Sequence, residues 1–119
     1  MWPARLSGKQ RQGQQWEERA LQHLLGHGLT LVETNFHCKS GEIDLILRDG
    51  AALVFVEVRQ RAGRTHGGAA ASITPAKMGR VVRAAQTYLL RFPRVPACRI
   101  DVLAIDGEAI DWLKNAIEV

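Results

Sequence analysis

The apolar positions of this chain change period along its length, which predicts a mixture of helices and strands. From residue 10 to about residue 26 they recur at helical spacing, and the glycines at 26 and 28 predict the end of that helix. Three short apolar runs follow, and each predicts a strand: TLVETNF, GEIDLILR and ALVFVEVR. The pair Asp49-Gly50 between the last two runs predicts a tight two-residue hairpin.

A second helix and a further strand complete the predicted core. Thr74 and Pro75 suit a helix N-cap and first helical position, so a helix is predicted from there to about Phe92. The run CRIDVLAID predicts another strand, and AIDWLKNAIEV a short strand and a terminal turn. The resulting order is αβββαβ, an α/β fold with a mixed central sheet flanked by helices. We expect residues 1–10 to form a flexible arm and residues 11–119 a single domain.

Acidic residues interrupt both apolar strands of the predicted hairpin. If Asp49-Gly50 is the turn, cross-strand partners have numbers that sum to 99, so Glu42 lies opposite Glu57 and Asp44 lies opposite Phe55. Because side chains alternate between faces, one face then carries several acids beside apolar groups and an arginine: Glu42, Asp44, Ile46, Leu53, Phe55, Glu57 and Arg59. Asp44 and Glu57 become diagonal neighbours on it.

Carboxylates gathered at one end of a sheet need a compensating charge. A hard divalent cation such as Mg²⁺ or Mn²⁺ is one solution, and cross-strand salt bridges to Arg48 and Arg59 are another. Salt bridges explain Glu57 less well, because valines flank it in a run typical of a buried strand.

The two predicted helices add charged residues that point inward. Glu17 falls in the middle of the apolar arc of the first helix, and Lys77 falls inside the apolar arc of the second. Arg80 and Arg83 are predicted to face away from that second arc. Glu17 and Lys77 together with the hairpin acids indicate a site rather than isolated salt bridges.

The charge distribution indicates a polyanionic partner. The net charge is +4, yet residues 58–100 contain nine Lys or Arg and no acid. Such a block favours nucleic acid over a solvated basic face, and the candidates for phosphate contact are Arg61, Arg64, Arg80 and Arg83. Two isolated cysteines, no apolar run long enough for a transmembrane helix and no secretory signal lead us to expect a cytoplasmic protein without a membrane partner.

These motifs together resemble a known family. Trp16-Glu17, GEIDLI, VFVEVR and Lys77 resemble the YraN family of small bacterial proteins, whose function is unsettled. That family is related to restriction-endonuclease-like nucleases with the PD-(D/E)XK signature, which include archaeal Holliday-junction resolvases. By this resemblance Asp44 and Glu57 match the two acids of the signature, and Glu17 matches a helix acid of resolvase-like members.

The resemblance implies a Mg²⁺- or Mn²⁺-dependent endonuclease. Glu17, Asp44 and Glu57 would hold the metal, and Arg59 and Lys77 would contact the scissile phosphate. Arg59 stands where the signature has lysine, and an arginine cannot act as a base, so Lys77 is the hypothesised source of the missing amine. Resolvase similarity suggests branched DNA and a homodimer. The alternatives are a nucleic-acid-binding module of the same fold without turnover, and a protein-interaction domain whose hairpin acids form salt bridges.

Overall fold

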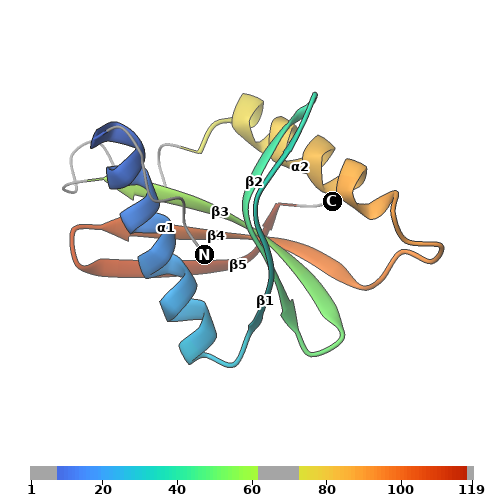
Figure 1. Cartoon of the computed structure of the whole chain (residues 1–119), viewed down its shortest axis with the longest axis horizontal. Helices are drawn as coiled ribbons and strands as arrows, with labels where there is room; N and C mark the ends of the chain where they lie inside the picture. The colour runs from blue at the N-terminus through green and yellow to red at the C-terminus, as the bar shows by residue number, and fades with distance from the viewer. Residues whose placement is uncertain (1–7, 62–72, 118–119) are drawn as a thin grey trace.

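The computed structural model describes residues 8–61 and 73–117, which form a five-stranded sheet with one helix on each face (Figure 1). The elements are α1 (Gly8–Gly26), β1 (Thr30–Cys38), β2 (Gly41–Asp49), β3 (Ala52–Arg61), α2 (Pro75–Leu89), β4 (Cys98–Asp106) and β5 (Ala109–Ile117). Neighbours in sequence are neighbours in the sheet, and all pairs are antiparallel except β3 with β4, which α2 connects. This mixed sheet confirms the predicted α/β class and is consistent with a restriction-endonuclease-like core.

Three element boundaries differ from the prediction. α1 begins at Gly8, so residues 8–10 of the predicted arm are helical, while residues 1–7 lie outside the described residues. α2 ends at Leu89, before Phe92. β5 is a full strand of nine residues instead of a short one, because it pairs with β4 along nearly its whole length. Within the described part of the chain, neither helix has the length and apolar character needed to cross a bilayer.

Both helices end or begin with the predicted capping chemistry. At the end of α1, Gly28 has φ +91°, and the N–H groups of Gly28 and Leu29 donate to the carbonyls of Leu25 and Leu24 at 3.0 and 3.2 Å. This is the Schellman arrangement that a glycine makes possible. At the start of α2, the Thr74 hydroxyl accepts from the backbone N–H of Lys77 at 3.3 Å.

Two hydrophobic clusters hold the helices on opposite faces of the sheet. α2 covers a cluster around Phe55, in which Tyr88 stacks edge-on against that ring at 5.7 Å between centroids. α1 covers the other face through Ala20, Leu21 and Leu24. Strand residues alternate between the clusters, with Ile46, Leu53 and Phe55 under α2 and Leu45, Leu47, Val54 and Val56 under α1.

The predicted register of the β2–β3 hairpin is wrong by two residues. Asp49 pairs with Ala52, so partner numbers sum to 101 and the turn consists of Gly50 and Ala51. Gly50 adopts φ +62°, as the first central residue of a two-residue hairpin requires. Continued beyond its last pair, Leu45 with Val56, this register brings Asp44 level with Glu57 and leaves Glu42 away from Glu57.

The strands separate at Asp44. Ile43 packs in the same cluster as Ile46, which breaks the strict alternation predicted for Glu42, Asp44 and Ile46. The paired ladder also ends there, since no pair beyond Leu45 with Val56 is formed. The backbone N–H of Val58 has no strand partner on β2 and donates instead to Asp44 Oδ2 at 2.8 Å. β2 and β3 therefore diverge beyond the pair Leu45–Val56. We call this divergence the fork, and the Asp44 carboxylate lies at the point where the two strands separate.

A fully buried carboxylate links β4 and β5. Asp101 on β4 is fully buried and accepts from Arg99 Nε at 3.0 Å, from Trp112 Nε1 at 2.8 Å and from the Asn115 N–H at 2.8 Å. Arg99 also donates to Asp49 at 3.0 Å. Because its acceptor sites are filled, this aspartate serves as a structural link between β5, β4 and the β2–β3 turn.

Gly41 fixes where the β1–β2 turn meets α2. A Cβ at this position would lie 2.6 Å from the Arg80 carbonyl oxygen, which is backbone and cannot swing away. The absence of a side chain therefore lets the start of β2 touch α2 directly, and this contact sets the spacing between two elements of the site described below.

We predict that Gly41→Ala lowers the free energy of unfolding by about 1–3 kcal/mol, because the added methyl group must displace the backbone of α2. Chemical denaturation followed by circular dichroism measures this loss. Gly26→Ala is the matched control, since a Cβ there meets no atom within 4 Å. Equal stability of the two variants would contradict the close approach.

Candidate active site

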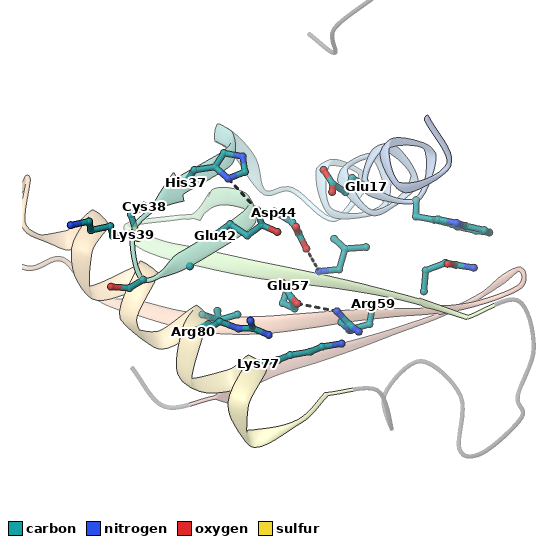
Figure 2. A pocket seen from close by; sticks show the side chains of 16 residues that line it. Glu17, His37, Cys38, Lys39, Glu42, Asp44, Glu57, Arg59, Lys77 and Arg80 are labelled. Carbon is teal, nitrogen blue, oxygen red and sulfur yellow. Dashed lines mark hydrogen bonds and ion pairs between the residues drawn. The ribbon is translucent and has the colours of Figure 1, made fainter. Parts of the chain in front are cut away.

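A pocket of about 650 Å³ opens at the fork between β2 and β3. α1 contributes Glu17 from one side and α2 contributes Lys77 and Arg80 from the other, with Asp44 and Glu57 between them (Figure 2). The β1–β2 turn closes one end. Residues that are distant in sequence and lie on both faces of the sheet thus meet in one cavity.

Asp44 is an acid of the pocket whose pKa is strongly shifted. Burial raises the pKa of its carboxyl group well above the ordinary value, and the nearby charges of Glu57 and then Glu17 raise it further. A side-chain hydrogen bond with Glu57 acts in the same direction, while the bond from the Val58 N–H opposes the shift. A partly buried carboxyl group close to other carboxyl groups is a characteristic feature of functional sites.

Glu57 and Arg59 lie on the β3 side of the fork. The side chain of Glu57 is only 14% exposed, and its Oε2 accepts from Arg59 Nη1 at 3.3 Å. The guanidinium group of Arg59 is therefore partly engaged by the neighbouring acid, as the salt-bridge alternative anticipated. That alternative leaves Asp44 without an ion-pair partner among the described residues.

Glu17 reaches the pocket from α1, where the helical pattern predicted it to point inward. Its pKa is raised from 4.5 to about 7, chiefly by burial and then by the charges of Glu42 and Glu57. Glu42 itself pairs with His37 Nδ1 at 3.1 Å on the exposed rim. Near neutral pH the carboxyl group of Glu17 is therefore poised between its protonated and ionised forms.

The donor chemistry of the pocket fits a hard divalent cation. Carboxylate oxygens are the ligands that Mg²⁺ and Mn²⁺ prefer, and the raised pKa values of Asp44 and Glu17 show that their negative charge lacks compensation. Asp44 and Glu57 are already in contact. Among residues 8–61 and 73–117, no three His, Cys, Asp or Glu side chains are already grouped closely enough to hold a metal ion.

The predicted basic residues divide into those at the pocket and those elsewhere. Lys77 lines the pocket as predicted, whereas Arg80 was wrongly expected to face away and lines it as well. Arg83 is exposed on α2 and is absent from the lining. Arg61 ends β3 but its side chain is not described, and Arg64 lies outside the described residues.

Sequence reasoning overlooked the β1–β2 turn. Lys39 and its neighbours His37 and Ser40 line one end of the pocket (Figure 2). The one signal in the sequence was position, because this polar turn directly precedes the GEID motif that carries Asp44. His23 and His27, by contrast, pack against each other and against Trp112 at the other end of α1.

The raised pKa of Glu17 predicts a stability cost that depends on pH. The cost is absent below pH 4.5, grows as the pH rises and is complete above about pH 7, because ionisation is hindered only in the folded state. After allowance for solvent screening, Glu17→Gln should raise the free energy of unfolding at pH 8 by about 1–2 kcal/mol and change it little at pH 4.5. Denaturant titrations at the two pH values measure the difference.

Glu108→Gln, on the exposed β4–β5 turn, controls for the loss of one negative charge. If Glu17→Gln and Glu108→Gln behave alike at pH 8, Glu17 is not the strained acid that we describe.

Metal binding is predicted to stabilise the folded protein through the same carboxylates. At pH 8 and a Mg²⁺ or Mn²⁺ concentration of roughly ten times the dissociation constant, the native state should gain about 1.4 kcal/mol. This gain corresponds to a rise of about 5 °C in the melting temperature. Asp44→Asn should abolish the rise, whereas Asp111→Asn, an exposed aspartate on β5, should retain it. An equal rise in both variants would exclude Asp44 as a ligand.

Comparison with known sequences agrees with the resemblance drawn from the motifs. The chain matches the description "Uncharacterised protein family UPF0102" over residues 16–105, which include Glu17, Asp44, Glu57 and Lys77. A UPF0102 protein of Herminiimonas arsenicoxydans is 58% identical over 106 residues, covering 89% of this chain and 86% of that protein. One from Janthinobacterium sp. (strain Marseille) is 55% identical over 112 residues, covering 94% and 91%. One from Cupriavidus taiwanensis is 56% identical over 112 residues, covering 92% and 85%. The chain therefore belongs to the UPF0102 family, the YraN-like group that its motifs resemble.

Proposed function

We propose that this protein is a metal-dependent endonuclease that hydrolyses phosphodiester bonds in nucleic acid, with DNA as the favoured substrate. The observation that carries the proposal is the partly buried Asp44 carboxyl group, which shares a pocket with Glu57 and Glu17 and with the basic side chains of α2. Carboxylates of raised pKa beside free cations suit a reaction that needs both a metal and an anionic substrate.

The carboxylates supply the metal-binding half of the site. Asp44 and Glu57 would hold Mg²⁺ or Mn²⁺ from the fork, and Glu17 would complete the set from α1. When bound, such an ion would supply activation of the attacking water and stabilisation of negative charge on the phosphate. The hydrogen bond from the Val58 N–H holds Asp44 in place, so this ligand is oriented before any ion binds.

The cations supply the phosphate-binding half. Arg59 remains engaged with Glu57 at 3.3 Å, which orients its guanidinium group toward the pocket but restricts it. Lys77 on α2 has no hydrogen-bonding or ionic partner for its ammonium group among the described residues. Lys77 is therefore the residue better placed to meet the scissile phosphate, and Arg59 supports it electrostatically.

Cleavage of labelled duplex, flap and four-way-junction DNA with Mg²⁺ or Mn²⁺ tests the proposal. We expect metal-dependent cleavage that falls by at least about 100-fold in Asp44→Asn and in Glu57→Gln, because each removes a charged ligand. Lys77→Ala should reduce cleavage more than Arg59→Lys does. Asp111→Asn and Glu108→Gln, exposed acids remote from the pocket lining, are the matched controls and should cleave normally.

The same assay separates the rival functions. A catalytically inactive binding module would bind DNA equally well with and without a chelating agent and cleave none of the substrates. A protein-interaction domain would show neither salt-sensitive DNA binding nor stabilisation by metal. Full cleavage by Asp44→Asn would remove the proposed mechanism altogether.

A further inference from the structure

Three basic side chains follow the α2 side of the pocket in one row. Arg80 and Lys77 on α2 direct their side chains toward Glu57 and Arg59, and Lys39, on the β1–β2 turn at the end of the pocket, directs its side chain outward (Figure 2). The carboxyl groups occupy the fork beside this row. We propose that Lys39, Arg80 and Lys77, here called the cation row, bind consecutive phosphates of a single nucleic-acid strand and position it along the fork.

The three side chains of the cation row are unpaired within the described part of the chain. Among the described residues, the side-chain nitrogens of Lys39, Arg80 and Lys77 have no hydrogen-bonding or ionic partner. Acids lie in the same pocket, so the lack of pairing is not due to a local shortage of negative charge. The row therefore remains available to an external anion.

Three acids of the pocket have partners outside the cation row. Glu42 is paired with His37 at 3.1 Å, and Glu57 is paired with Arg59 at 3.3 Å. Asp44 accepts from the Val58 N–H at 2.8 Å where β2 and β3 separate. The pocket thus pairs Glu42 and Glu57 with other partners and leaves the cation row without an acidic partner among the described residues.

The β1–β2 turn that carries Lys39 lies against α2 at Arg80. At Gly41, two residues after Lys39, the chain lies against the Arg80 carbonyl oxygen so closely that a Cβ would be 2.6 Å away. Arg80 and Lys77 are three residues apart on α2, so they lie on the same side of the helix, about 4.5 Å apart along its axis. A backbone contact and helical geometry thus place Lys39 near Arg80 in the fold, and Arg80 next to Lys77 on the helix.

A row of separate cations matches a chain of phosphates better than a single anion. One phosphate can engage one or two of these groups, whereas a strand presents a new phosphate for each. A row of this kind contacts the sugar-phosphate backbone and carries no base recognition by itself. The substrate class is therefore a polymer strand, DNA or RNA, in contrast to a free nucleotide.

This inference rests on the proposed function, since it assigns the cation row to the same substrate. It adds Lys39 as a binding residue, moves Arg80 from the outer surface into the site, and gives the strand a path from Lys77 toward the β1–β2 turn.

The test measures strand affinity by fluorescence anisotropy in EDTA, over a range of salt concentrations, with single-stranded DNA and RNA 20-mers. Removing one cation that binds a phosphate should lower the slope of log affinity against log salt by about 0.7, the value per phosphate for single strands. We expect this decrease, with several-fold weaker binding at low salt, for Lys39→Gln and for Arg80→Gln. Lys39→Arg should restore the wild-type slope, because it keeps the charge.

Arg94→Gln and Lys114→Gln are the matched controls, since both residues are exposed and absent from the pocket lining. They should keep the wild-type slope. Thermal unfolding of every variant, followed by circular dichroism, confirms that the fold is retained. DNA and RNA that bind alike would show a track that reads phosphates alone, and a difference between them would show that the sugar is also contacted.

Three results would overturn the cation row. Wild-type slopes in Lys39→Gln and Arg80→Gln, together with metal-dependent cleavage that still requires Asp44, would reject the row and leave the proposed function standing. Displacement of the strand by poly-glutamate at equal charge concentration would show a general acidic-polymer surface. If the wild-type protein binds no strand even at low salt, the row and the proposed function both fail.

Discussion

Where β2 leaves β3, one hydrogen bond replaces the ladder, and the arrangement of the pocket depends on it. The Val58 N–H would be an unsatisfied donor beyond the last strand pair, and the Asp44 carboxylate takes the place of the missing strand carbonyl. This substitution permits the strands to separate without a buried orphan group. It also draws a carboxyl group into the partly dry interior, where its ionisation is disfavoured. The open fork and the perturbed acid therefore have the same origin.

The separation of charges in the pocket follows from how its walls are built. The central wall consists of the adjacent strands β2 and β3. Neighbouring strands hold facing side chains a short, fixed distance apart, so the acids of β2 and β3 lie close to one another. The opposite margin consists of a helix and a turn with their flexible, solvated cations. Direct pairing across the pocket would cancel this asymmetry. The structure instead keeps a region of raised proton affinity next to a region of free positive charge.

Local signals predicted the elements, and tertiary contacts decided the rest. Thr74-Pro75 and Gly28 marked helix boundaries because capping depends on a few adjacent residues. The hairpin register was missed because Gly50 can occupy either central position of a tight turn, and the choice depends on how the strands pack. The error was an even number of residues, so Asp44 and Glu57 remained neighbours.

The site residues divide in the same way. Helical periodicity was sufficient for Glu17 and Lys77, since each lies on the side of its helix that faces the sheet. It failed for Arg80, because a helical wheel contains the apolar arc but not the β1–β2 turn that leans against α2. Lys39 belongs to that turn and has no periodic signal at all. Only the close contact at Gly41 reveals its neighbours.

The origin of the acids on both faces of the sheet has a consequence for the folding pathway. Glu17 lies on α1, Asp44 and Glu57 lie on adjacent strands, and the helix that borders them from the other side joins the parallel pair β3–β4. Parallel pairing across such a connection requires slow closure of a long loop. A nascent chain in which only the hairpin has formed would hold two of the carboxyl groups in water, at ordinary proton affinity and without the third. The complete cluster therefore exists only once α1 has docked on the sheet beside the hairpin.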